Sequence, residues 1–283
     1  MYTAKDQVHV CNDADGLASY AATWLVRLID RKRQDPDMSG PFVLALSGGS
    51  TPKKMLSILA ESMDGAVDWS DIVLLWGDER NVAPEHADSN FRMVKEVLLD
   101  RIDIPPENVL AVPDPGGSAR SAANAYEKVL KERLAAEKDG GGNTAGGSQA
   151  KEKADDKSPT PALPEIDCVL LGMGDDVHTA SLFPQTKALN EKKRWVVANE
   201  VPKLECERIT FTAPLINAAR NVAFLICGEG KREALAKLWH APRDVQEFPS
   251  QLIRPENGQL WFLLDKPALG DTPLPHSVMV QMI

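Results

Sequence analysis

Short runs of aliphatic and aromatic residues recur along the chain, and more polar stretches separate them. Runs of about four to eight apolar residues, bounded by Gly, Pro or polar residues, are typical of strands that are buried in a sheet. We therefore expect strands at residues 42–46, 72–76, 109–112, 166–171, 195–198, 209–212, 222–227 and 260–264.

Helical patterns lie between most of these runs. In residues 14–33, apolar side chains recur at three- and four-residue spacing, which places them on one face of a helix. Because strands alternate with helices, the predicted fold class is α/β, with a doubly wound, mainly parallel sheet flanked by helices. Further helices are expected at residues 52–62, 89–101, 119–137 and 231–240.

One segment breaks this alternation. Residues 139–164 combine glycine clusters with a run of charged residues, and such a composition buries too little apolar surface to order itself. A long flexible loop adds little closure entropy, about 0.6 kcal/mol for each doubling of its length. We therefore expect a single domain over residues 1–283 that carries a low-complexity surface insertion at about 139–164.

The composition narrows the range of partners. The formal net charge is −9 and no basic stripe offsets it, so nucleic acid is not an expected partner. The longest apolar runs reach about six residues, whereas a helix that spans a bilayer needs about 18. The N-terminus shows neither the basic nor the apolar region of a secretory signal. We expect a cytoplasmic protein without a membrane partner, in which an anionic ligand would need a local cluster of cations.

The first candidate site is the glycine loop, residues 47–52, which follows the predicted strand at 42–46. Gly48 and Gly49 allow close backbone approach, and Ser50 and Thr51 add hydroxyl donors. We expect Thr51 to be the N-cap of the next helix, with proline at its first position. Free N–H groups and the helix dipole make such a start a phosphate site. A simple tight turn is the alternative, since neither a Walker loop nor a dinucleotide glycine motif is present.

The second candidate site follows the next predicted strand. Asp78 and Arg80 stand just past the end of that strand, where parallel sheets place their ligands. Two more cations occur later in the chain, Arg208 before an alternating apolar run and Lys231 at the start of a predicted helix. Each of these is ordinarily a surface cation, so their role depends on whether the fold brings them to the glycine loop.

The third candidate site is the histidine loop, residues 172–184, which follows the predicted strand at 166–171. A Gly-x-Gly turn there leads into Asp176 and His178, and a histidine at such a junction faces the ligand crevice. The five histidines show no metal-ligand spacing, so no metal is expected. No G-x-S-x-G elbow occurs either, so His178 would have to activate water directly. A loop histidine without a role is the alternative.

Taken together, these segments resemble the family of 6-phosphogluconolactonases and glucosamine-6-phosphate isomerases. The similarity spans nearly the whole chain outside residues 139–164, and several motifs in the same order are a far stronger signal than any one of them. The motifs are SGGSTP (47–52), GDER (77–80) with SN (89–90), GMGDD (172–176), HTASLFP (178–184), RIT (208–210) with NAAR (217–220), and GEGK (228–231).

Two positions distinguish the branches of this family. The deaminases typically read D-E-Y and D-G-H-I-A-F-N-E-P, whereas this chain has Arg80 in place of the tyrosine and no glutamate in residues 181–184. The resemblance therefore favours the lactonase branch, and it implies hydrolysis of 6-phosphoglucono-δ-lactone to 6-phosphogluconate in the oxidative pentose phosphate pathway. A deaminase or isomerase of the same fold and a non-catalytic sugar-phosphate sensor remain alternatives.

The resemblance also implies roles for single residues. His178 would be the general base and then the general acid, Asp176 would support its imidazole, and Arg80 is a candidate donor to the oxyanion. The reaction would need no cofactor, and we expect a monomer with a small sugar phosphate as its substrate. The expected substrate and phosphate contacts are Gly48, Gly49, Ser50, Thr51, Asp78, Arg208 and Lys231.

Two residues depart from the usual G-P-D-G-H-T pattern of the lactonases, because Asp175 replaces the proline and Val177 replaces the second glycine. An extra carboxylate beside His178 would favour the imidazolium form. A β-branched residue resists positive φ, so we expect a negative φ at Val177. Both expectations concern the immediate surroundings of the candidate base.

Deletion of residues 140–158 should leave folding and kcat almost unchanged, because a polar, glycine-rich segment contributes little packing. Thermal unfolding and turnover of the deletion variant measure the two quantities. A large loss of activity would show instead that this segment covers the site.

Overall fold

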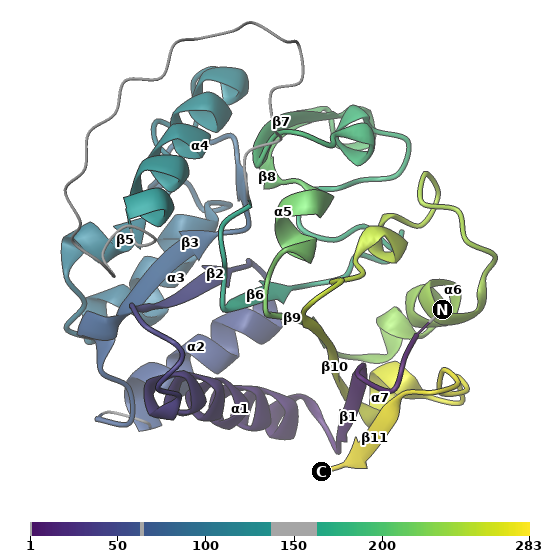
Figure 1. Cartoon of the computed structure of the whole chain (residues 1–283). Coiled ribbons are helices and arrows are strands. Elements are labelled where there is room, and N and C mark those ends of the chain that lie inside the picture. The colour runs from purple at the N-terminus through teal and green to yellow at the C-terminus, as the bar shows by residue number, and fades with distance from the viewer. Residues whose placement is uncertain (1, 63–64, 137–162) are drawn as a thin grey trace, which may run out of the picture.

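The computed structural model describes residues 2–62, 65–136 and 163–283, so the expected insertion at about 139–164 lies almost entirely outside the described residues. A sheet of eight strands forms the centre of this part of the chain, in the order β11-β1-β10-β9-β6-β2-β3-β5 (Figure 1). Every neighbouring pair in it is parallel, which confirms the predicted sheet. Its strands are β1 (Gln7–Cys11), β2 (Phe42–Leu46), β3 (Ile72–Trp76), β5 (Val109–Leu110), β6 (Cys168–Leu171), β9 (Asn221–Ile226), β10 (Gln259–Asp265) and β11 (Met279–Met282).

Helices cover both faces of this sheet. In Figure 1, α1 and α2 run along one side, and α4 and α5 lie on the other. The predicted helix at 89–101 is shorter than expected, because α3 ends at Val97 and a 3₁₀ turn follows. The helices are α1 (Ala14–Gln34), α2 (Ser50–Ser62), α3 (Asn90–Val97), α4 (Ala119–Ala136), α5 (Ala213–Asn217), α6 (Arg232–His240) and α7 (Lys266–Leu269). The 3₁₀ turns are η1 (Trp69–Asp71), η2 (Leu99–Arg101), η3 (Pro106–Asn108), η4 (Lys187–Asn190), η5 (Pro202–Leu204), η6 (Glu229–Lys231) and η7 (Pro249–Leu252).

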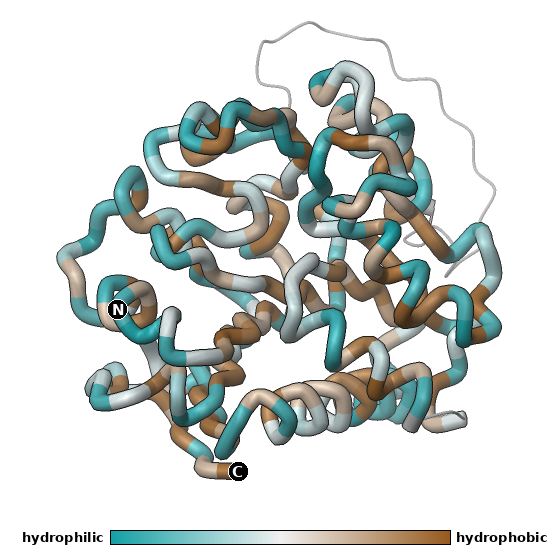
Figure 2. The backbone as a smooth tube through the Cα atoms, turned by 180° about the vertical axis from the view of Figure 1, so that it is seen from behind, coloured by the Kyte–Doolittle hydropathy of each residue, from teal (hydrophilic) through white to brown (hydrophobic). Residues whose placement is uncertain are grey.

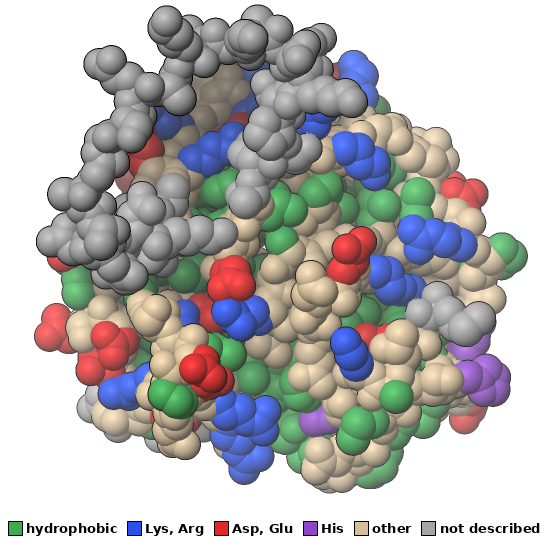
Figure 3. Space-filling view, viewed as in Figure 1, with side chains coloured by type: hydrophobic (Ala, Val, Ile, Leu, Met, Phe, Trp, Pro, Cys, Tyr) green, Lys and Arg blue, Asp and Glu red, His purple; other side chains and the backbone are tan. Residues whose placement is uncertain are grey.

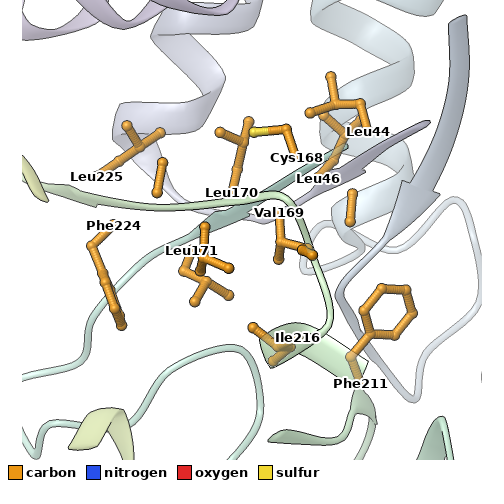
Figure 4. Packing of buried hydrophobic residues seen from close by; sticks show 14 of the residues in the cluster. Leu44, Leu46, Cys168, Val169, Leu170, Leu171, Phe211, Ile216, Phe224 and Leu225 are labelled. Atoms are coloured by element: carbon orange, nitrogen blue, oxygen red, sulfur yellow. The ribbon is translucent and has the colours of Figure 1, made fainter. Parts of the chain in front are cut away.

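The strands β2, β3 and β6 are apolar along their whole length because both of their faces are buried. In β6, Cys168 and Leu170 point to one face of the sheet, and Val169 and Leu171 point to the other (Figure 4). None of these four side chains is more than 1% exposed. Figure 2 shows the same division along the chain, with hydrophobic segments in the interior and hydrophilic ones in the outer loops. These strands therefore form the core of the described fold.

A second, antiparallel sheet was not predicted. It has the order β4-β8-β7, with β4 (Asp78–Arg80), β7 (Val196–Val201) and β8 (Cys206–Phe211). The strands expected at 195–198 and 209–212 belong to this sheet rather than to the parallel one. Helix α4 joins the two sheets, because the hydroxyl of Tyr126 hydrogen-bonds to the backbone of Trp76 at 2.7 Å and Glu127 accepts the backbone N–H of Trp195 at 2.8 Å.

The parallel arrangement brings the carboxyl ends of β2, β3, β6 and β9 to one edge of the central sheet. The glycine loop, the histidine loop and η6 follow β2, β6 and β9 at that edge, and β4 starts there after β3. None of the helices in the described ranges has the length and apolarity that crossing a bilayer requires.

Candidate active site

A cavity of about 520 Å³ opens at this edge of the sheet and joins the three candidate loops. All ten residues that the sequence proposes for catalysis or for binding line it, although they come from segments far apart in the chain. They are Gly48, Gly49, Ser50, Thr51, Asp78, Arg80, Asp176, His178, Arg208 and Lys231. The fold therefore does bring Arg208 and Lys231 to the cavity that the glycine loop lines.

The glycine loop enters α2 earlier than expected. The helix begins at Ser50, and the N–H of Lys53 bonds to the carbonyl of Gly49 at 3.0 Å, so Thr51 lies in the first turn instead of capping it. Gly49 has a φ of +110°, which a side chain would strain. At Gly48 a Cβ atom would lie 2.0 Å from Oδ1 of Asn90. The two glycines thus let the backbone turn sharply beside α3. The first residues of α2 line the cavity, and N–H groups at a helix start lack partners within the helix.

The short strand β4 presents alternate side chains to opposite sides. Asp78 and Arg80 line the cavity. Asp78 accepts a hydrogen bond from Oγ of Ser181 at 2.7 Å, and the guanidinium of Arg80 donates to the carbonyl of Asp88. Both side chains are therefore held in place before any ligand arrives.

Glu79 lies between these two residues and is turned away from the cavity. Its buried carboxylate accepts the backbone N–H groups of Arg80, Asn90 and Phe91 at 2.7–2.8 Å. Burial raises the pKa of Glu79, and these hydrogen bonds oppose that rise. Glu79 thus accepts the first N–H groups of α3 and holds Asn90 in place. Asn90 also lines the cavity.

His178 is oriented by a carboxylate two residues before it. Its Nδ1 lies 2.5 Å from Oδ1 of Asp176, and Oδ2 of Asp176 accepts from Nζ of Lys203 at 3.0 Å. The ring stacks on Phe183 with centroids 3.9 Å apart and an angle of 20° between the planes. The hydrogen bond from His178, with a further one from Lys203, holds the pKa of Asp176 well below its usual range. Asp176 is therefore the ionised partner of His178 in this cavity.

The expected negative φ at Val177 is wrong. Its φ is +61°, and that of Ala180 is +47°. For a β-branched residue this conformation is unfavourable by about 1–3 kcal/mol, so contacts with the surroundings must stabilise it. They do so because Val177 is fully buried and its carbonyl accepts both the N–H of Ser250 at 2.9 Å and its Oγ at 2.7 Å. The loop keeps the left-handed turn that a glycine would adopt freely.

Asp175 does not serve His178 as expected. Its Oδ1 lies 2.5 Å from Nζ of Lys231, so its charge is directed to that ammonium, and Asp176 is the carboxylate that contacts the imidazole. Lys231 itself ends the 3₁₀ turn η6 and precedes α6 instead of lying inside that helix. Among the residues that the structure describes, the guanidinium of Arg208 has no ion-pair partner.

Lys203 is a charged residue of the cavity that the sequence did not reveal. It lies in η5, outside every motif, and reaches Asp176 only because the β7–β8 hairpin folds over the histidine loop. Phe183 and Ser181 belonged to a recognised motif, but their contacts with His178 and Asp78 follow from packing alone.

The chain is also similar to known proteins. A family model described as glucosamine-6-phosphate isomerases/6-phosphogluconolactonase matches residues 12–262. The chain belongs to this family. A 6-phosphogluconolactonase from Nostoc sp. is 38% identical over 92% of this chain and 95% of that protein. One from Synechocystis sp. is 38% identical over 81% of this chain and 84% of that protein.

A solved structure supports the same family. The chain superposes on a 6-phosphogluconolactonase from Trypanosoma cruzi with a TM-score of 0.75 and 29% identity, covering 95% of this chain and 97% of that one. The comparisons concern the family and the fold. The contacts in the cavity are those of this chain.

Gly174→Ala should disable the histidine loop, because a Cβ there would lie 2.0 Å from Nδ1 of His178 and 2.8 Å from Oδ1 of Asp176. We expect kcat to fall by about 100-fold or more, the contribution of a positioned base, and stability to fall by about 1–3 kcal/mol from overpacking. The control is Gly172→Ala in the same loop, where a Cβ meets nothing within 4 Å. Equal activity of the two variants would contradict this packing.

Proposed function

We propose that this protein hydrolyses 6-phosphoglucono-δ-lactone to 6-phosphogluconate, in the oxidative pentose phosphate pathway and without a cofactor. The observation that carries the proposal is the pairing of His178 with Asp176 in the cavity that also contains the glycine loop, Arg208 and Lys231. The names of the Nostoc and Synechocystis relatives support the same reaction.

The tautomer of His178 follows from its partner. Ionised Asp176 can only accept a hydrogen bond, so Nδ1 of His178 carries the proton and Nε2 keeps a free lone pair. Nε2 takes a proton from water as the water oxygen attacks C1 of the lactone. When the bond between C1 and the ring oxygen breaks, the imidazolium returns that proton to the ring oxygen. Asp176 steadies the imidazolium in between without changing its own protonation state.

Attack on C1 places negative charge on the carbonyl oxygen, which needs donors that are already oriented. Arg80 is our candidate, because its bond to the carbonyl of Asp88 fixes the guanidinium at the cavity wall. Backbone N–H groups of the histidine loop are the alternative donors. Asp78, held by Ser181, is positioned to accept a hydroxyl of the sugar.

The 6-phosphate has a matching site across the cavity. The N–H groups at the start of α2 and the hydroxyls of Ser50 and Thr51 supply donors, and Arg208 and Lys231 supply charge. Holding the phosphate there positions the lactone carbonyl for attack. Every one of these residues comes from the same chain, so we also propose that a monomer is sufficient for the reaction. We further propose that the reaction takes place in the cytoplasm.

The direct test is turnover of freshly generated lactone, with product coupled to an NADP-dependent dehydrogenase and spontaneous hydrolysis subtracted. The protein should accelerate hydrolysis, and His178→Ala should lower kcat by about 100- to 10,000-fold with little change in KM. His178→Gln, which keeps a polar side chain of similar size, is the matched control and should be equally inactive. Release of ammonia from glucosamine 6-phosphate without lactone turnover would replace this proposal by a deaminase.

Asp176→Asn should lower the maximal rate. The neutral amide neither stabilises the imidazolium nor fixes the tautomer of the neutral ring, so kcat should fall by about 10- to 1,000-fold. Steady-state turnover of the lactone measures this loss. A kcat equal to that of the wild type would show that Asp176 does not act on the base.

A further inference from the structure

The ion pair between Asp175 and Lys231 joins two loops of the cavity. The residues are 56 positions apart in sequence, and Oδ1 of Asp175 lies 2.5 Å from Nζ of Lys231. Asp175 follows β6 and Lys231 follows β9, and these two strands are neighbours in the parallel sheet. The pair therefore lies at the cavity edge where the proposed phosphate site is.

The two partners differ in freedom. The side chain of Lys231 is 29% exposed, whereas that of Asp175 is 77% exposed. The ammonium is thus held at the cavity wall, and the carboxylate can turn into solvent without leaving a buried group unpaired. An arriving anion can take the place of Asp175 on Lys231 with no other rearrangement.

The remaining charges of the cavity are used differently. Asp176 pairs with His178 and Lys203, and Asp78 is hydrogen-bonded to Ser181. Among the carboxylates that line the cavity, Asp175 is the one whose ion pair engages a proposed phosphate ligand. The lining contains four cations (Arg80, Lys203, Arg208 and Lys231) and three carboxylates (Asp78, Asp175 and Asp176), which leaves a net charge of +1.

We propose that Asp175 competes with the 6-phosphate for Lys231 and so determines how tightly phosphorylated ligands are held, an inference that builds on the proposed function. A carboxylate oxygen and a phosphate oxygen accept from an ammonium in the same way, and the phosphate carries the larger charge. Phosphate binding therefore displaces Asp175. Breaking the ion pair between Asp175 and Lys231 costs free energy, which weakens the binding of substrate and product alike. A proline at this position, as in the usual lactonase pattern, offers no such competitor.

The test is calorimetric binding of inorganic phosphate and of 6-phosphogluconate, which requires no turnover. Asp175→Asn keeps the shape and removes the charge, and it should bind both ligands roughly 2- to 5-fold more tightly, as expected for a partly exposed ion pair. In turnover, KM should fall by the same factor without a rise in kcat, because the competition acts on ground state and transition state equally.

Two further variants separate competition from a general field effect. In a Lys231→Met background, adding Asp175→Asn should change phosphate affinity by less than the factor seen in the wild type. The reason is that the ammonium for which Asp175 and phosphate compete is absent. Glu229→Gln is the matched control, because Glu229 is two residues from Lys231, pairs with Arg232 and does not line the cavity. It removes one negative charge nearby and should leave phosphate affinity almost unchanged.

Unchanged or weaker phosphate binding by Asp175→Asn would overturn the proposal, and so would an equal gain in the Lys231→Met background. These outcomes are independent of the reaction. If the protein proves inactive on the lactone but Asp175→Asn still binds phosphate more tightly through Lys231, the proposed function fails and the competition stands.

Discussion

The hydrogen bond of 2.5 Å between Nδ1 of His178 and Oδ1 of Asp176 is the interaction on which the candidate site depends. It joins residues two positions apart, so the backbone between them must turn sharply. Gly174 makes room for the imidazole, and Val177 accepts a left-handed conformation that Ser250 holds from outside. The loop is thus shaped around one side-chain pair, at the expense of local backbone preference.

The central sheet positions the loops that surround this pair. Because its strands are parallel and buried on both faces, their carboxyl ends meet at one edge, and the loops that follow them supply base, phosphate donors and cations. The cavity has a net positive lining although the chain as a whole carries −9. On the face in Figure 3, Lys and Arg side chains are interspersed with Asp and Glu side chains. Selectivity for an anionic ligand is therefore a local property of the cavity.

The sequence predicted the features that depend on the burial of apolar residues. It did not predict the features that depend on contacts between distant segments. The central strands were predictable because they are short apolar runs bounded by turn residues. No such run marks the other three strands, since β1 contains Gln7 and His9, β4 is charged throughout and β11 is exposed. The glycine loop, Asp78 and His178 could be named because strand ends in parallel sheets converge, whereas Arg208 and Lys231 were assigned to the site only by the family resemblance. The φ of Val177 could not be predicted, since burial and the hydrogen bond from Ser250 override the intrinsic preference of valine. Neither could Lys203, which reaches the site through the packing of a hairpin.

The most direct test of this account is the tautomer of His178, measured by ¹⁵N NMR of the imidazole nitrogens at a pH where the ring is neutral. The chain contains five histidines, and the loss of one pair of resonances in His178→Gln assigns the relevant ring. The account predicts a protonated Nδ1, bonded to Asp176, and an unprotonated Nε2 that can accept a proton from water. A neutral ring with the proton on Nε2 would contradict it, because Nδ1 would then have no proton to share with Asp176 and Nε2 could not act as the base.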